Sequence, residues 1–73
     1  IEFMASYDQL MTCLGRKISV EYEDGRLEEF SLRQIKSNGN EDQSIGMWKG
    51  GVVVDSEGEE HPINPEDLVS LVM

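Results

Sequence analysis

The sequence predicts a mostly β domain that starts with a short α-helix and continues as a five-stranded small barrel, with a one-turn helix before the last strand. Three observations lead to this prediction: a capped apolar helix pattern near the N-terminus, alternating apolar and polar residues over 18–23, and tight-turn sequences at Asp24-Gly25 and 55–58. Short strands bounded by turn residues are typical of small antiparallel sheets.

The predicted helix covers residues 7–14. Ser6 suits the N-cap position, and Gln9 three residues later completes a capping-box pattern. Gly15 follows, where helices often end in a left-handed residue. The apolar residues at helical spacing should lie on the sheet: Tyr7, Leu10, Met11 and Leu14.

The first predicted hairpin joins strand 18–23 to strand 26–33 through Asp24-Gly25, which is typical of a two-residue turn. That turn would place Phe30 on the polar face, because a shift of one residue reverses the two faces of a strand. We therefore expect a β-bulge near Glu28-Glu29, which would bend the strand and curl the sheet.

The rest of the chain divides into short segments. The expected order is a polar loop 37–44, strands 45–48 and 51–54, a turn 55–58, a strand 59–63, a helical turn 64–67 and a last strand 68–72. Asn64 suits the cap of that helical turn and Pro65 suits its first position.

This order of elements resembles the SH3-like and Sm-like small β-barrels. In SH3-like barrels a short 3₁₀ turn precedes the last strand, as Ile63-Asn64-Pro65-Glu66-Asp67-Leu68 does here. In Sm-like proteins a helix leads into the first strand after a Leu-Gly pair, and Leu14-Gly15 followed by residues 16–26 is similar to that opening. The Sm-like resemblance implies an oligomeric RNA-binding subunit, although Pro65-Glu66-Asp67 stands where those proteins carry an Arg-Gly element.

The chain is strongly acidic, with 15 Asp and Glu against 6 Lys and Arg and a net charge of −9. All basic residues lie between Arg16 and Lys49, and the chain from Gly50 onward has acids but no Lys or Arg. Such a surface repels phosphate backbones, so we expect a protein partner with a basic surface and no direct nucleic-acid binding. The alternative, that net charge only keeps the domain in solution, stays open.

The length of the chain and its lack of a targeting signal indicate its domain organisation and its localisation. The chain has 73 residues, which suits one domain, and we expect residues 1–3 to be a cloning remnant and residues 4–73 to be a single small β-barrel domain. A single cysteine and the lack of a signal peptide or long apolar run predict a cytoplasmic protein without membrane association. Homo-oligomerisation would supplement a core this small.

No residue set predicts catalysis, a cofactor or a metal site, so we expect a non-enzyme. Cys13 and His61 are the only thiol and imidazole, and we interpret them as a structural helix cysteine and a surface histidine. Asp55, Glu57 and Glu59 alternate as in cation-binding loops, but Gly58 does not fall at the sixth position that a calcium loop requires. We interpret this stretch as a solvated turn.

The predicted function is a protein-interaction module that uses an acidic face and an aromatic anchor. The candidate partner-binding residues are Trp48, Asp55, Glu57, Glu59 and Glu60. Trp48 suits an interface anchor because it offers a large apolar area and one donor, while a core position under the helix is the alternative. Two other functions compete: an acidic inhibitor that imitates nucleic acid, and the Sm-like RNA-binding subunit.

Overall fold

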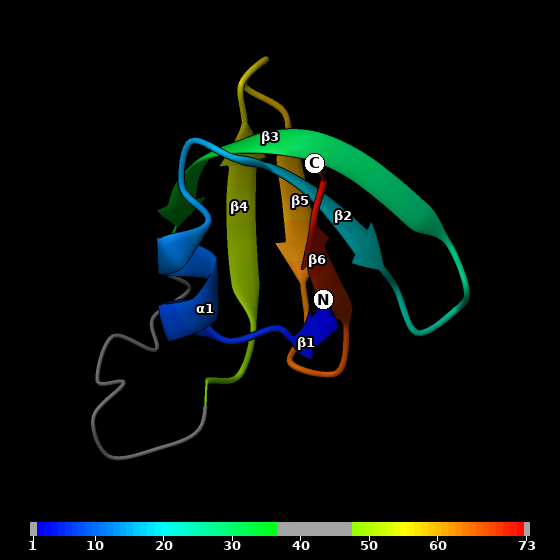
Figure 1. Cartoon of the computed structure of the whole chain (residues 1–73). Helices are drawn as coiled ribbons and strands as arrows, with labels where there is room; N and C mark the ends of the chain where they lie inside the picture. The colour runs from blue at the N-terminus through cyan, green and yellow to red at the C-terminus, as the bar shows by residue number, and fades with distance from the viewer. Residues whose placement is uncertain (1, 37–47, 73) are drawn as a thin grey trace.

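The computed structural model describes residues 2–36 and 48–72. In this part of the chain the elements are β1 (Glu2–Met4), α1 (Tyr7–Thr12), β2 (Lys17–Glu21), β3 (Leu27–Lys36), β4 (Gly51–Asp55), β5 (Glu60–Ile63) and β6 (Leu68–Leu71). All strand pairs are antiparallel, in the order β1-β6-β2-β3-β4-β5 (Figure 1). The predicted mostly β domain with a short N-terminal helix is confirmed.

The long strand β3 bends the sheet, as Figure 1 shows. Its residues 27–31 pair with β2, whereas residues 32–36 pair with β4, with a register shift between Leu32 and Gln34. The first half of β3 therefore pairs with β2 along one edge, and its second half pairs with β4 along the opposite edge. Among the described residues, no strand pairs with the second edge of residues 27–31.

The turn between β2 and β3 has three residues instead of the predicted two. The Tyr22 N–H donates to the Arg26 carbonyl and the Gly25 N–H donates to the Tyr22 carbonyl, each at 2.9 Å. Gly25 has a φ of +93°, the left-handed residue that three-residue hairpin loops require. The predicted bulge near Glu28-Glu29 is wrong, because the turn supplies the extra residue and the β2–β3 register runs without a break.

The helix forms where predicted but buries a different face. The Ser6 side chain accepts from the Gln9 N–H at 3.3 Å, which confirms the N-cap. Leu10 and Cys13 are buried, whereas Met11 and Leu14 are 44% and 38% exposed, so their predicted burial is wrong. The helix ends at Thr12, and so short a helix covers the sheet with a single i, i+3 pair.

Asp67, and not Asn64, supplies the side-chain oxygen of the turn before β6. The Asp67 N–H donates to the Asn64 carbonyl at 3.0 Å, and the Asn64 N–H donates to Asp67 Oδ2 at 2.8 Å. Residues 64–67 therefore form one hydrogen-bonded turn where a helical turn was predicted.

The sheet gains a strand that the sequence did not predict. Glu2–Met4 forms β1 and pairs with β6, and Phe3 is partly buried against the core. Residues 1–3 were expected to be a cloning remnant outside the fold, yet Glu2 and Phe3 lie in this strand with Met4. Of the predicted strand 45–48, residues 45–47 lie outside the described residues, and Trp48 is in no strand.

Seven fully buried aliphatic side chains make up most of the core between α1 and the sheet: Leu10, Ile18, Val20, Leu32, Val53, Ile63 and Val69. The alternation predicted for residues 18–22 is confirmed, since Ile18, Val20 and Tyr22 are all buried. The same register places Glu28 opposite Val20, on the core face of β3.

Candidate functional site: an acidic groove around His61

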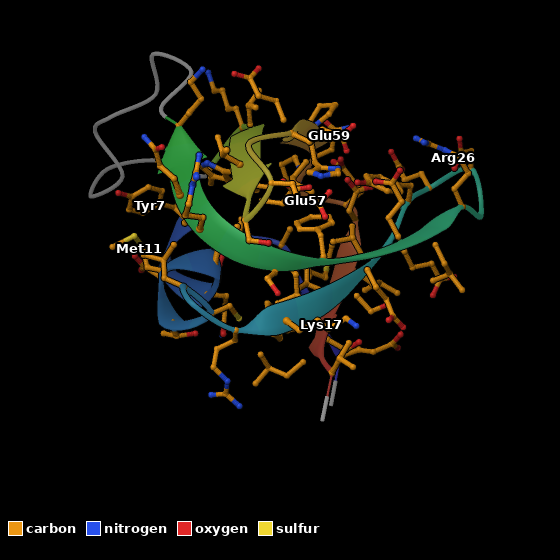
Figure 2. The ribbon with its side chains drawn as sticks, turned by 90° about the horizontal axis from the view of Figure 1, so that it is seen from above. Tyr7, Met11, Lys17, Arg26, Glu57 and Glu59 are labelled. Carbon is orange, nitrogen blue, oxygen red and sulfur yellow. The ribbon has the colours of Figure 1, made fainter. Side chains whose placement is uncertain are left out.

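A pocket of about 430 Å³ lies where β3 passes the β4–β5 turn. Its lining includes five acidic residues: Glu28, Glu29, Asp55, Glu57 and Glu59. Lys17 is the one basic lining residue and His61 the one imidazole. We call this pocket the acidic groove. In Figure 2, Glu57 and Glu59 lie on one side of the β3 ribbon and Lys17 lies on the other.

His61 on β5 lies at the centre of a carboxylate network. Its Nε2 is 2.8 Å from Asp55 Oδ2, and its Nδ1 is 3.3 Å from Glu28 Oε1. The ring stacks on Phe30, with centroids 3.9 Å apart and planes 7° apart. The side chain is only 12% exposed, so the predicted surface histidine is wrong.

Protonation decides how many of these contacts His61 makes as a donor. An imidazolium has two N–H groups and donates to both carboxylates, whereas a neutral ring donates to one. With ionised carboxylates, the doubly protonated ring satisfies both contacts. In the neutral ring one of the two contacts has no proton between the nitrogen and the carboxylate oxygen, so that contact is lost as a hydrogen bond.

Asp55 ends β4 and organises the β4–β5 turn. Its Oδ1 accepts from the Glu57 and Glu59 N–H groups, each at 2.9 Å, while Oδ2 faces His61. The hydrogen bond from His61 and these two backbone N–H groups lower the pKa of the Asp55 carboxyl below its ordinary value. Because Asp55 is 5% exposed, it is a buried anchor and not part of a solvated turn.

Tyr22 and Glu28 continue the network toward β2. The Tyr22 hydroxyl donates to Glu28 Oε1 at 2.7 Å. This hydrogen bond is the main cause that lowers the pKa of Glu28, and the hydrogen bond from His61 lowers it further. Burial, and then the bond to the Glu28 carboxylate, raises the pKa of Tyr22. The three-residue turn creates this contact, because it places Glu28 and Tyr22 on the same face of the hairpin.

The predicted partner-binding residues do not all meet. Glu57 and Glu59 are exposed at the acidic groove, and Asp55 lies beneath them. Glu60 is exposed outside the lining and pairs with Lys36, Nζ to Oε2 2.5 Å apart. Sequence reasoning missed the other groove residues because β3 reaches the turn only through the tertiary fold.

Trp48 does not line the acidic groove. The expectation that Trp48 and the acidic residues 55–60 form one binding face is therefore wrong. Trp48 lines a second pocket, of about 510 Å³, with Lys49, Asn64, Pro65 and Glu66. Trp48 and Lys49 precede β4, which starts at Gly51, whereas Asp55 is its last residue. Trp48 is partly buried against the core, so it is neither a fully exposed interface anchor nor a fully buried core residue.

The arrangement does not form a nucleophile pair. Cys13 is buried, as predicted for a structural cysteine, and its sulfur lies 4.0 Å from the Thr12 hydroxyl. Both His61 nitrogens face carboxylates. One set of side chains among the described residues has metal-ligand chemistry: the ligand atoms of Asp55, Glu59 and His61 all lie within 4.8 Å of one another.

Comparison of the chain with protein-family models, with curated proteins and with solved structures finds no match in any of the three. Within the described part of the chain, no helix combines the length and apolar character needed to cross a membrane.

Proposed function

We propose that the chain is a non-enzymatic protein-interaction module whose acidic groove binds a basic segment of a partner protein. The observation that supports this most is the charge of the groove, which has five acidic lining residues against one lysine. Lys17 is itself opposed by Glu29, Nζ to Oε1 3.8 Å apart. A positive side chain of a partner would therefore meet an excess of carboxylates.

The exposed carboxylates give the groove its capacity to bind from solution. Glu29, Glu57 and Glu59 are exposed, whereas Asp55 and Glu28 are held by bonds within the network. Exposed charges of one sign around a concave surface raise the rate of encounter with an oppositely charged partner. Asp55 and Glu28, held by the network, fix the shape of the groove, and the three exposed glutamates supply the attraction.

The open edge of β3 suggests how the segment binds. Arg26 and Leu32 make backbone bonds on the β2 side, so the alternation of an antiparallel strand directs the backbone of residues 27, 29 and 31 to the other edge. Ser56 N–H donates to the Ser31 carbonyl there at 3.0 Å. An extended basic segment would add to this edge as a strand, with its side chains among the glutamates.

The test compares two triple variants with the same change in charge. E29Q/E57Q/E59Q removes the exposed groove carboxylates, and E2Q/E21Q/E23Q removes three exposed carboxylates elsewhere. The probe is a labelled peptide alternating Arg and Thr, titrated in buffer with EDTA. Three exposed pairs at about 0.5 kcal/mol each predict about tenfold weaker binding to the groove variant and about unchanged binding to the control.

Three outcomes would contradict this proposal. Equal weakening by both variants would show attraction to net charge alone. Failure of the wild-type chain to bind the peptide better than a Glu-Thr peptide would exclude the groove as a basic-segment site. The third is an unchanged hydrogen-exchange rate of the Glu29 amide in the complex. Strand addition would give that amide a hydrogen-bond partner and slow its exchange.

The two competing functions predict different experimental results. An inhibitor that imitates nucleic acid would bind folded nucleic-acid-binding proteins in preference to the peptide, and its binding would weaken sharply at about 0.5 M salt, where the Debye length is about 4 Å. The SH3-like or Sm-like form of the sheet, and the ring-forming RNA-binding subunit that it implies, also remain proposals. A monomer by light scattering would exclude the ring.

A further inference from the structure

We propose that Asp55, Glu59 and His61 bind one divalent transition-metal ion, of which Zn²⁺ is the test case. Their ligand atoms already lie within 4.8 Å of one another, and all three residues line the acidic groove. This site shares Glu59 with the proposed binding surface for a basic segment, but it does not use Glu29, Glu57 or the open edge of β3.

His61 is oriented as a metal-ligating histidine. Glu28 Oε1 faces Nδ1 at 3.3 Å, so the ring can keep its Nδ1 proton when a metal replaces the Nε2 proton that faces Asp55 Oδ2. Histidine ligands commonly donate their second ring N–H to a carboxylate, which fixes the tautomer and the ring orientation. Stacking on Phe30 holds the ring in its plane.

Asp55 is also preorganised. Its Oδ1 is held by two backbone N–H groups of the turn, so Oδ2 is the oxygen that is directed toward the imidazole. In the metal-free protein Oδ2 and Nε2 are 2.8 Å apart. Two ligands of a tetrahedral zinc lie about 3.4 Å apart, given bond lengths of about 2.0–2.1 Å. The pair therefore needs to open by only about 0.6 Å.

Glu59 would close the site from the exposed side of the turn. Its backbone N–H is already bonded to Asp55 Oδ1, which fixes the base of the side chain. The side chain is exposed, so its carboxylate can rotate inward without displacing a buried neighbour. Three protein ligands leave the fourth position of a tetrahedral ion to water.

The donor set selects the class of ion. One imidazole and two carboxylates suit Zn²⁺, Ni²⁺ and Cu²⁺, whereas Ca²⁺ and Mg²⁺ prefer sites made of oxygen ligands alone. Binding replaces the Nε2 proton by the metal, so an initially doubly protonated ring releases one proton for each ion bound. His61 is the only histidine and Cys13 is buried, so an imidazole signal has one source.

Isothermal titration of the metal-free chain with Zn²⁺ alone tests the proposal. We expect one ion per chain, about tenfold or more weakening in E59Q and H61Q, and no change in E23Q, which removes an exposed carboxylate outside the acidic groove. Because H61Q removes a partly buried ring, E59Q keeps the test valid if H61Q does not fold. In a buffer acidic enough to protonate both ring nitrogens, proton release, measured from the buffer dependence of the heat, should accompany binding.

The ¹⁵N spectrum of the imidazole identifies the ligand atom. Zn²⁺ should shift the His61 Nε2 resonance and leave Nδ1 protonated. Equal affinity of E59Q and wild type, binding of Mg²⁺ as tight as that of Zn²⁺, or an unshifted imidazole at saturation would overturn the site. The peptide titration in EDTA is independent of these results, so either proposal can fail alone.

Discussion

At the scale of single residues, His61 connects parts of the molecule that are far apart in the sequence. It contacts Glu28 from β3 and Asp55 from the end of β4, and it stacks on Phe30. Asp55 in turn holds the β4–β5 turn through two backbone bonds. A change of charge on any member therefore affects both the fold and the groove.

Acid should destabilise the protein through these carboxyls. The folded state lowers the pKa of Asp55 and Glu28, so the unfolded chain binds more protons in the acid range. Their contribution is complete above the unfolded values of about 3.9–4.3 and is lost as the pH falls through the lower folded values. Urea unfolding over a series of acidic pH values should show the free energy of unfolding falling with pH.

Substitution assigns this pH dependence to the network. D55N and E28Q should each flatten the acid-side fall, whereas E57Q, which makes the same charge change in the same turn, should keep it. A D55N profile parallel to that of the wild type would show that other carboxyls govern acid unfolding. E28Q serves the same purpose if D55N is too unstable to measure.

At the scale of elements, the helix illustrates how few contacts a short segment contributes. Only Leu10 within α1 is buried, with Cys13 at its C-cap, and Met11 faces outward beside them. The apolar spacing of the sequence fits both arrangements, because Leu10 is followed by apolar residues at positions i+1, i+3 and i+4. The end of the helix at Thr12 decides which of them is buried.

Alanine substitution distinguishes the two helix faces. L10A should lower the free energy of unfolding by about 2–5 kcal/mol, because it leaves a cavity in a fully buried position. M11A should change it by less than about 0.5 kcal/mol, as for exposed sites. Chemical denaturation of both variants measures the difference, and similar losses would mean that Met11 is packed in solution.

At the scale of the whole molecule, the order of strands leaves two ends of the sheet, β1 and β5. Two of the three residues of β1, Glu2 and Phe3, are ones that the sequence suggested excluding, yet β1 covers the edge of β6 through three paired positions. An uncovered edge is a template for pairing with another chain. The covering of this edge by β1 should therefore limit pairing of β6 with another chain.

Removing residues 1–3 should expose the β6 edge and also remove Phe3 from the side of the core. We expect a lower thermal midpoint and concentration-dependent self-association, both measured against the full chain by light scattering and thermal unfolding. F3A, which shortens the side chain but keeps the backbone of β1, separates the packing effect from the edge effect. A shortened chain that stays monomeric with an unchanged midpoint would contradict a structural role for β1.

The sequence by itself determined the helix cap at Ser6, the alternation of Ile18, Val20 and Tyr22, and the mostly β class. These follow from local spacing, because capping and strand alternation involve residues a few positions apart. The sequence also marked Glu57 and Glu59 as exposed acids. It did not show what would face them across the groove.

Only the tertiary structure decided the site. A third residue in the β2–β3 turn shifts the register by one, which brings Glu28 to the core face and within reach of Tyr22 and His61. The same bent strand lines the acidic groove together with Asp55, whereas Trp48 lines a different pocket, so the acidic and aromatic features separate. A register shift of one residue reverses the faces of a strand, and the sequence pattern fitted both a bulge and a longer turn.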